Sequence, residues 1–363
     1  MSSRTHTALL LAFQLLCLGT QAQKPFCDSV CLYRPGDYGS ANWRIPALLC
    51  LDNGTLLAVN DRRKYNEIDL PEDIDIVGRR STDMGRTWSA PQPLIEGTGR
   101  GHGYGDPALV QCQNGDVLCL FAGHNGYFQS TDQAPICVFL MRSRDRGQTW
   151  DDTVNLTPVL WDSASPYRGA FVASGNGVRL KQGPRAGRIL FAASMLRRAE
   201  WVSDNYIIYS DDEGHTWHRS QMAFRGGDES KLIELADGRI LLSVRRNGER
   251  GYNTSADGGI TWEAQGLWPE MTVNACNGDM LRLDDTTLLH SIPNSMQREN
   301  VSIYRSTDEG RSWHSPRLLA AGPSVYSSLT LLPDGTVGCL VEKNPSGFCE
   351  LWFYRFNREW MER

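Results

Sequence analysis

One eight-residue pattern, Ser-x-Asp-x-Gly-x-x-Trp, occurs five times in this chain of 363 residues. In such a turn the aspartate accepts hydrogen bonds from backbone N–H groups, and the glycine supplies a backbone position with positive φ. The tryptophan ring then packs against the sheet that carries the turn or against its neighbour. Five copies of one local structure predict a fold built from repeats. The copies span residues 81–88, 143–150, 210–217, 255–262 and 306–313.

The segments that precede the copies are alternating or apolar, as in 136–140, 206–209 and 301–304. Such segments predict strands, so each copy is expected to be a β-hairpin turn. The copies begin 62, 67, 45 and 51 residues apart, a spacing typical of a radial all-β architecture with one sheet per repeat. At about 55 residues per sheet, the sequence predicts a six-bladed β-propeller in which residues 23–363 form a single domain.

Residues 1–22 are expected to be a secretory signal peptide. An apolar run over residues 8–18 is followed by Thr20-Gln21-Ala22, which offers small residues for cleavage before Gln23. The run is too short for an ordinary membrane-spanning helix, and no later stretch reaches 18 apolar residues. We therefore expect a protein that is secreted, periplasmic or in a lysosomal-type lumen, with no stable membrane span.

Charge and cysteine usage narrow the classes of function. The net charge is −5, which gives no reason to expect a nucleic-acid partner or an anionic membrane. Nine cysteines remain after residue 22; Cys27 and Cys31 could pair, whereas the others lie mostly in apolar runs and are either buried thiols or disulfides. No Cys-x-x-Cys pair is present, and His215 and His218 lack a third ligand, so neither a metal nor another cofactor is expected. The glycine-rich stretch 97–105 lacks the Lys-Ser/Thr ending of a phosphate loop.

The segment Asn42-Trp43-Arg44-Ile45-Pro46-Ala47-Leu48 resembles the Arg-Ile-Pro motif of the exo-α-sialidases (neuraminidases) of the bacterial and animal type. In that family the motif precedes several turns of the kind described above, which are called Asp boxes. The resemblance runs from Arg44 to about Glu342.

This resemblance implies a six-bladed β-propeller. It also implies hydrolysis of terminal sialic acids, with retention, through a tyrosyl-enzyme intermediate. The substrates would be sialylated glycoproteins, glycolipids or oligosaccharides. The alternatives are a propeller that binds sialic acid without catalysis and a trans-sialidase.

The resemblance also implies three arginines around the carboxylate of the sugar. Arg44 matches the first, Arg245 the second and Arg298 the third, and the adjacent Arg246 competes for the second position. Guanidinium groups suit this task because bidentate pairing fixes both the charge and the plane of a carboxylate. Glu342 resembles the glutamate that holds the first arginine in place.

Tyr326 matches the nucleophile of the family, and Glu229, 16 residues before Arg245, matches its base. A carboxylate nucleophile would repel an anionic sugar, whereas a neutral phenol with an adjacent base avoids that repulsion. A phenol with a pKa of about 10 needs such a base to act near neutral pH.

The acid/base residue is predicted to be Asp69, six residues after Arg63 in a loop. Arg63 then resembles the arginine near the 4-hydroxyl of the sugar, and Asp106 resembles the aspartate beside the 4-hydroxyl and the N-acyl group. Asp73 and Asp75 open the following strand and are expected to face solvent or to cap the loop.

Overall fold

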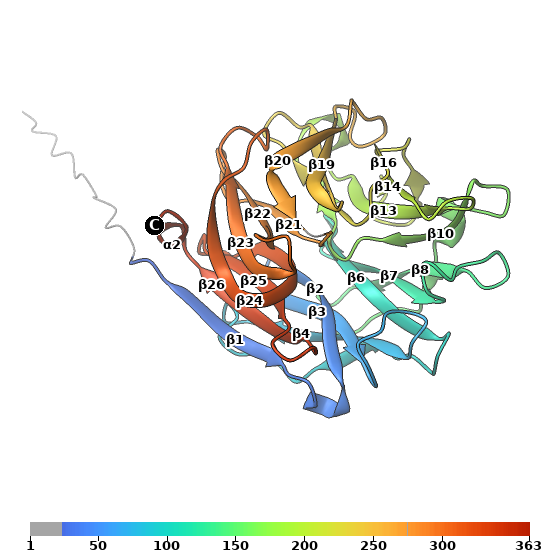
Figure 1. Cartoon of the computed structure of the whole chain (residues 1–363), viewed down its shortest axis with the longest axis horizontal. Coiled ribbons are helices and arrows are strands. Elements are labelled where there is room, and N and C mark those ends of the chain that lie inside the picture. The colour runs from blue at the N-terminus through green and yellow to red at the C-terminus, as the bar shows by residue number, and fades with distance from the viewer. Residues whose placement is uncertain (1–23, 274) are drawn as a thin grey trace, which may run out of the picture.

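Hydrogen-bonded strands make up about half of the described residues. The computed structural model describes residues 24–273 and 275–363, so the predicted signal peptide lies outside the described residues. Five sheets pack in a propeller-like arrangement (Figure 1). The α-helices in the described part are α1 (Thr157–Leu160) and α2 (Arg358–Met361), and none there is long and apolar enough to cross a membrane. The all-β prediction is confirmed.

Two sheets are four-stranded antiparallel meanders, in which each strand pairs with the next one along the chain. The first contains β2 (Asn42–Cys50), β3 (Leu56–Arg63), β4 (Ile74–Ser81) and β5 (Gln92–Ile95). The other contains β17 (Ser230–Glu234), β18 (Ile240–Val244), β19 (Gly248–Ser255) and β20 (Gly266–Val273).

Two further sheets add short strands to the same meander. In one, the short strand β11 (Gly175–Asn176) runs parallel to the innermost strand; its other members are β6 (Gly103–Gln111), β7 (Val117–His124), β8 (Ile136–Ser143) and β9 (Val154–Asn155). The second has the order β10-β13-β14-β15, with β12 and β16 added at the side. These six strands are β10 (Tyr167–Val172), β12 (Val178–Arg179), β13 (Ile189–Arg197), β14 (Ser203–Ser210), β15 (His218–Arg219) and β16 (Phe224–Arg225).

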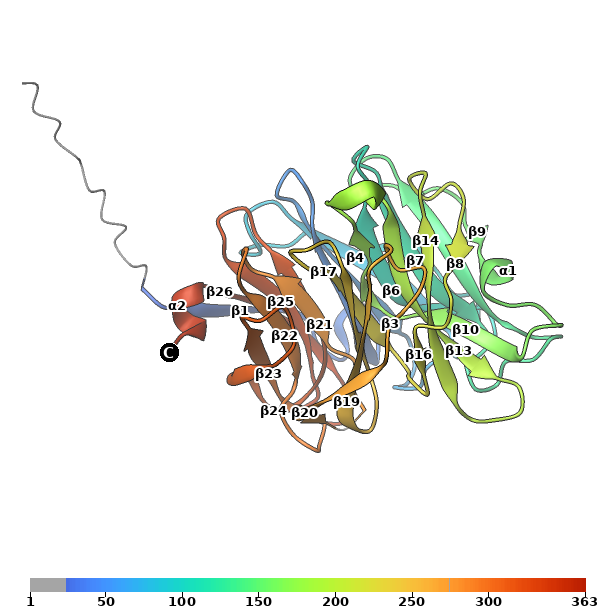
Figure 2. The same cartoon turned by 90° about the horizontal axis from the view of Figure 1, so that it is seen from above.

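The seven-stranded sheet joins the two ends of the described chain. Its order is β1-β26-β25-β24-β23-β22-β21, so β1 lies beside β26, close to α2 (Figure 2). The long strand β24 pairs with β23 as far as Pro323 and with β25 from Ser324 onward. The strands are β1 (Cys27–Tyr33), β21 (Asp279–Arg282), β22 (Leu288–Pro293), β23 (Glu299–Ser306), β24 (His314–Leu331), β25 (Val337–Lys343) and β26 (Glu350–Phe356).

The Asp boxes form the hairpin turns that their sequence predicts. In the first copy, the hydroxyl of Ser81, which ends β4, donates to Asp83 and accepts the N–H of Gly85, with distances of 2.8 and 2.9 Å. Thr87 donates its N–H and its hydroxyl to the same aspartate, and these hydrogen bonds lower the pKa of Asp83 to about 2. The same serine–aspartate bond recurs in the other four copies.

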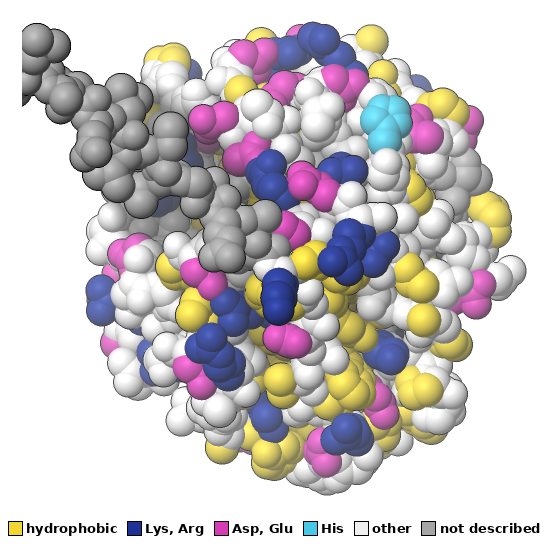
Figure 3. All heavy atoms as spheres, turned by 90° about the vertical axis from the view of Figure 1, so that its left-hand side faces the viewer, with side chains coloured by type: hydrophobic (Ala, Val, Ile, Leu, Met, Phe, Trp, Pro, Cys, Tyr) yellow, Lys and Arg dark blue, Asp and Glu magenta, His cyan; other side chains and the backbone are white. Residues whose placement is uncertain are grey.

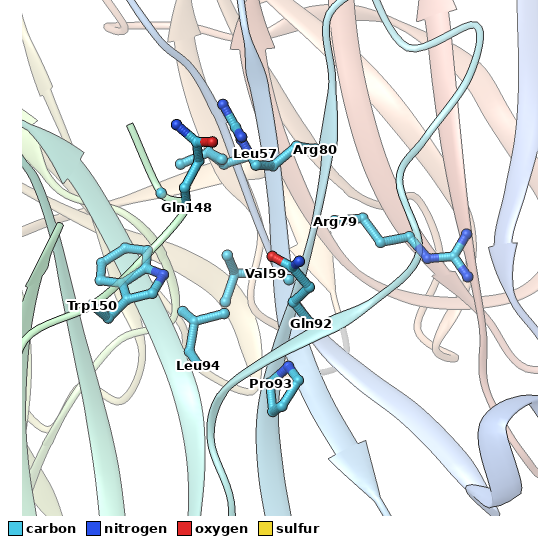
Figure 4. Close-up of a pocket in the computed structure, with 11 residues that line it drawn as sticks. Leu57, Val59, Arg79, Arg80, Gln92, Pro93, Leu94, Gln148 and Trp150 are labelled. Carbon is cyan, nitrogen blue, oxygen red and sulfur yellow. The ribbon is translucent and has the colours of Figure 1, made fainter. Parts of the chain in front are cut away.

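Each Asp box also fastens its sheet to the preceding one. A Cβ added to Gly147 would lie 2.8 Å from Leu57 of β3, and one added to Gly214 would lie 2.5 Å from Leu118 of β7. Figure 4 shows the second box from this side, with Trp150 close to Val59 of β3 and Leu94 of β5. The glycine is therefore required both for its positive φ and for the close approach of the neighbouring sheet.

The described cysteines are all free thiols. Cys27 and Cys31 do not form the disulfide considered from their spacing, because four residues of an extended strand separate them by about 13 Å. Cys112, Cys119 and Cys339 are buried in the apolar clusters between the strands. On the face drawn in Figure 3, acidic and basic side chains are interspersed, as the nearly balanced composition suggests.

Candidate active site

The predicted site residues lie at the end of the sheets opposite the Asp boxes. Arg63 ends β3 and pairs with Ile74 at the start of β4, whereas Ser81 of the Asp box lies at the other end of the same ladder. Arg44 lies near the start of β2, and its register partner is Asp61 of β3. The other strands place their predicted residues at this same end, as the contacts below show.

The hydroxyl of Tyr326 lies between a base and a cation. It donates to the carboxylate of Glu229 and accepts a hydrogen bond from Nη1 of Arg245 at 2.6 Å. Arg245 also contacts the Glu229 carboxylate directly, and Asn277 reaches the other carboxylate oxygen at 3.4 Å. The tyrosine is 6% exposed, and burial raises its pKa well above the usual value, although Arg245 opposes the shift. The resting phenol is therefore neutral and aligned with its base.

The spacing of Glu229 and Arg245 has a simple structural reason. Glu229 immediately precedes β17 and Arg245 immediately follows β18, so the two residues extend one hairpin ladder. The N–H of Arg245 donates to the carbonyl of Glu229 at 2.8 Å. Burial raises the pKa of Glu229, and the guanidinium of Arg245 acts against that shift.

Arg44 is held by the buried carboxylate of Glu342. Its Nε and Nη2 atoms lie 3.3 and 3.1 Å from Oε2, and Oε1 accepts the N–H of Ile45 at 2.5 Å. The guanidinium carbon of Arg44 lies 5.2 Å from the centre of the Tyr326 ring. Ile45 has a φ of 59°, which a β-branched residue rarely adopts, and this conformation directs its N–H at Glu342.

Arg298 completes the group of cations around the tyrosine. It lies between β22 and β23, with its guanidinium carbon 6.0 Å from the centre of the Tyr326 ring, and its Nη2 donates to the carbonyl of Ala275 at 2.7 Å. Arg246, the alternative to Arg245, lines a cleft beside Trp201 that Arg245 also lines, but it is Arg245 that donates to the hydroxyl of Tyr326. The structure therefore brings Arg245, and not Arg246, onto the hydroxyl of the tyrosine.

Asp69 lies in the loop between β3 and β4, with its side chain 75% exposed. Its carboxylate is 2.5 Å from Nη2 of Arg63 and 4.0 Å from Nη1 of Arg44. Partial desolvation raises the pKa of Asp69, but the two guanidinium groups outweigh it, so the net shift is downward. The free protein therefore carries an ionised Asp69.

The residues described so far can be compared with known proteins. Residues 68–339 match the family model described as "BNR repeat-like domain". The sialidase of Micromonospora viridifaciens is 31% identical over 350 residues, which cover 90% of this chain and 53% of that protein. The chain belongs to the BNR-repeat sialidase family.

A second relative and a solved structure agree with this assignment. The sialidase of Bacteroides fragilis is 29% identical over 345 residues, which cover 85% of this chain and 61% of that protein. The chain therefore spans between half and two thirds of the length of these two relatives. The Hadza microbial sialidase Hz136 superposes with a TM-score of 0.82 at 27% identity and covers 91% of this chain and 68% of its own.

Asp61 also belongs to the site, although the sequence did not predict it as a site residue. It is buried beneath Arg63, with Oδ2 3.2 Å from Nη2 of that arginine, and its Oδ1 accepts the N–H of Asp106 at 3.0 Å. Burial raises the pKa of Asp61, and burial together with the Asp61 carboxylate raises the pKa of Asp106.

A sequence signal for Asp61 exists in hindsight. Ile45-Pro46-Ala47-Leu48 and Asp106-Pro107-Ala108-Leu109 share Pro-Ala-Leu, and Ile45 and Asp106 both have a φ of 59°. Each donates its N–H to a buried carboxylate, Glu342 in the first case and Asp61 in the second. The repeated tripeptide therefore marks two equivalent backbone bends.

Of the two alternatives expected for Asp73 and Asp75, that they face solvent or cap the loop, the first is wrong: their side chains are 13% and 0% exposed. The Asp75 side chain is fully buried, and both carboxylates lie around the ammonium group of Lys64, at 2.7 and 2.9 Å. Asp75 also accepts the N–H of Gly97 at 2.8 Å. Lys64 comes from the opposite end of the same loop, and Gly97 from a neighbouring one. The position of the two aspartates at the start of a strand therefore did not reveal their burial.

Proposed function

We propose that this chain is an exo-α-sialidase that hydrolyses terminal sialic acids from glycoconjugates with retention. The observation that carries the proposal is the hydroxyl of Tyr326, held between Glu229 and Arg245, with the guanidinium of Arg44 near both the tyrosine ring and the exposed Asp69. A sialic-acid carboxylate is anionic near neutral pH, and the guanidinium groups of Arg44, Arg245 and Arg298 provide its binding partners. The sialidases among the similar proteins support the same activity.

The proposed reaction has two steps. In the first, the phenol oxygen of Tyr326 attacks C2 of the sugar while Glu229 accepts the phenol proton. The bond from C2 to the glycosidic oxygen breaks, and Asp69 gives that oxygen its proton. In the second step, Asp69 takes a proton from water as the water oxygen attacks C2, and Tyr326 leaves and regains its proton from Glu229. Two inversions at C2 give net retention.

The charges account for the order of these events. In the free protein Arg63 and Arg44 lower the pKa of Asp69, so this aspartate is not yet an acid. A bound sialic-acid carboxylate offsets the positive charge of Arg44, which raises the pKa of Asp69 toward a value suited to proton donation. Substrate binding and protonation of the acid are therefore coupled.

The remaining predicted residues have supporting roles in this proposal. Glu342 holds Arg44 because Nε and Nη2 both donate to its Oε2, which orients the guanidinium group for the substrate carboxylate. Arg63 and Asp106 would contact the 4-hydroxyl, with Asp106 also near the N-acyl group. Because the pKa of Asp106 is raised well above its usual value, its carboxyl group would be a hydrogen-bond donor.

We also infer the architecture and setting of the enzyme. The switch of β24 from β23 to β25 supports the view that the seven-stranded sheet is two blades, which makes a six-bladed propeller of residues 23–363 as a single domain. The proposed substrates are sialylated glycoproteins, glycolipids or oligosaccharides. The apolar segment before Gln23 supports export to a secreted, periplasmic or lysosomal-type compartment.

Incubation of the purified protein with 3′- and 6′-sialyllactose and an aryl sialoside tests the activity. We expect release of free sialic acid, with the α-anomer appearing first by NMR because the reaction retains configuration. Folded protein that releases no sialic acid from any of these substrates between about pH 4 and 8, the range expected for carboxylate acid–base chemistry, would support the binding module instead.

A further inference from the structure

The loop that carries Asp69 is held by contacts that do not involve the substrate. It connects β3 to β4 over residues 64–73, and Asp69 lies near its tip with an exposed side chain. A general acid must approach the glycosidic oxygen to within hydrogen-bond reach, about 2.6–3.2 Å. A mobile loop would lose that geometry, so the contacts at the base of this loop affect the chemistry.

Lys64 anchors the base of the loop. Its ammonium group lies 2.7 Å from Asp73, 2.9 Å from Asp75 and 2.8 Å from the carbonyl of Gly97. An ammonium group has three donors, and here each has an acceptor. The Lys64 side chain is 18% exposed, so this cluster is shielded from water more than an ordinary surface ion pair.

Lys64 and its neighbour Arg63 hold different parts of the loop. Arg63, the last residue of β3, contacts Asp69 at 2.5 Å. Lys64, the first residue of the loop, contacts Asp73 at the far end of the same loop.

The glycine-rich segment at residues 97–103 packs its bare backbone against the loop. A Cβ on Gly97 would lie 2.6 Å from the carboxylate of Asp73, and a Cβ on Gly103 would collide with the carbonyl oxygen of Glu72. The N–H of Gly101 donates to the carbonyl of Pro71 at 2.6 Å. The absence of a side chain at Gly97 and Gly103 is therefore a packing requirement of the loop.

An apolar contact secures the residue next to the acid. Leu70 is buried in a cluster with Ile74, Ala122, Ile136 and Phe171. The backbone on the C-terminal side of Asp69 is thus fixed by packing, while the carboxylate itself remains exposed.

We propose that Lys64 and the glycine-rich segment 97–103 position the catalytic acid. They clamp the loop so that Asp69 meets the glycosidic oxygen, and neither touches the substrate. The inference rests on the proposed sialidase activity, in which Asp69 is the acid. Lys64 and the segment 97–103 take no direct part in the proposed reaction steps, and positioning of Asp69 gives them a role.

The test compares two leaving groups in the full-length enzyme. A sugar alkoxide needs the proton of Asp69, whereas an acidic phenol leaves as an anion, so displacement of the acid affects the sugar substrate more. For Lys64→Met we expect the ratio of kcat/KM for 3′-sialyllactose to kcat/KM for an aryl sialoside to fall about tenfold, less than the 10²–10⁴-fold effect of losing a general acid. Lys64→Arg, which keeps the cation, should restore most of the ratio.

Two further variants separate positioning from stability. Gly103→Ala displaces the loop from its other side and should lower the same ratio. The control is Arg142→Met, at the Asp-box end of its sheet. Arg142 is 9% exposed, and its Nη1 lies 2.7 Å from the carboxylate of Asp116. Loss of this ion pair should lower the melting temperature and leave the kcat/KM ratio unchanged.

The inference is overturned if the ratio of the two kcat/KM values equals that of the wild type both in Gly103→Ala and in a folded Lys64→Met or Lys64→Gln variant. A lower melting temperature of these variants does not change that conclusion. Failure of the wild-type enzyme to cleave either substrate would instead contradict the proposed function.

Discussion

The chemistry of a single residue, Tyr326, depends on its two immediate neighbours. Its hydroxyl donates to Glu229 and accepts from Arg245, so the same oxygen has a proton acceptor and a stabilising cation already in place. Burial keeps the phenol neutral by raising its pKa, which avoids repulsion as the anionic sugar approaches. The nucleophile is therefore inert until the base and the substrate act together.

Replacement Tyr326→Phe tests this arrangement, because it removes the hydroxyl and keeps the ring that packs with Ile45, Cys276 and Val325. The variant should fold normally, and turnover should fall by about three orders of magnitude or more, as for loss of other nucleophiles. With a fluorinated sialoside that traps the intermediate, mass spectrometry should find the adduct on Tyr326 of the wild type and none at position 326 of the variant. An adduct on a different residue of the wild type would contradict the assignment.

Replacement Arg298→Lys keeps the charge and removes the planar fork of the guanidinium. Because Nη2 of Arg298 already donates to the carbonyl of Ala275, the rest of the group is fixed in orientation for a carboxylate. We expect a loss of about 1.5–3 kcal/mol in transition-state stabilisation, measured as kcat/KM. Arg246→Lys is the matched control and should have a much smaller effect; equal effects of the two substitutions would remove Arg298 from the site.

At the scale of elements, the Asp box is both a turn and a connector. Its serine, aspartate and glycine are bonded to one another within each copy, which makes the turn locally stable. Its glycine also contacts the second strand of the preceding sheet, as Gly214 does with Leu118. A substitution there should affect the turn and the packing of two sheets together.

Two glycines with the same backbone conformation separate these effects. Gly214 and Gly238 have φ values of 80° and 81°, but a Cβ would meet Leu118 at 2.5 Å in the first case and nothing within 4 Å in the second. Urea unfolding should show a loss of about 1–2 kcal/mol for Gly238→Ala from backbone strain alone. Gly214→Ala should lose about 1–3 kcal/mol more from overpacking; equal losses would show that the contact between sheets contributes nothing.

For the whole molecule, the contact between its two ends is the critical feature. Strand β1 completes the sheet of β26, and Tyr33 at its end stacks on Trp43 of β2, with ring centres 4.0 Å apart. Asn357, just after β26, accepts the N–H of Phe26 and donates to the carbonyl of Lys24, both at 3.0 Å. The Asn357 bonds hold the start of β1 against the last sheet, and the stacking of Tyr33 on Trp43 links that sheet to the first one. A ring of sheets gains its stability only when each has both neighbours.

Replacement Asn357→Ala should therefore weaken the closure of the ring. It removes both hydrogen bonds and also the bond that Oδ1 accepts from the N–H of Trp360 at 3.2 Å, and at about 1 kcal/mol for each bond we expect a loss of about 3 kcal/mol in the free energy of unfolding. Asn357→Asp keeps an acceptor for Phe26 and loses the donor to Lys24, so it should fall between wild type and alanine. An alanine variant with wild-type stability in urea would mean that the contact between the ends is dispensable.

The sequence alone was sufficient to predict structures whose hydrogen bonds join residues close together in the chain. The Asp boxes were predicted as hairpin turns because their hydrogen bonds join residues within one eight-residue segment, such as Ser81 to Gly85. Nine residues were named for the site by their place in motifs, and the structure brings them into one cluster; their roles stay predictions. These residues are Arg44, Arg63, Asp69, Asp106, Glu229, Arg245, Arg298, Tyr326 and Glu342.

Only the tertiary structure decided which distant groups meet. Glu342 holds Arg44 across a separation of 298 residues, and Asp61 was missed because its burial depends on Arg63 and on the N–H of Asp106. The burial of Asp75 around Lys64 likewise requires the loop at Gly97. A buried charge is tolerated only beside its partners, and those partners are set by which strands become neighbours, not by the residues on either side in the chain.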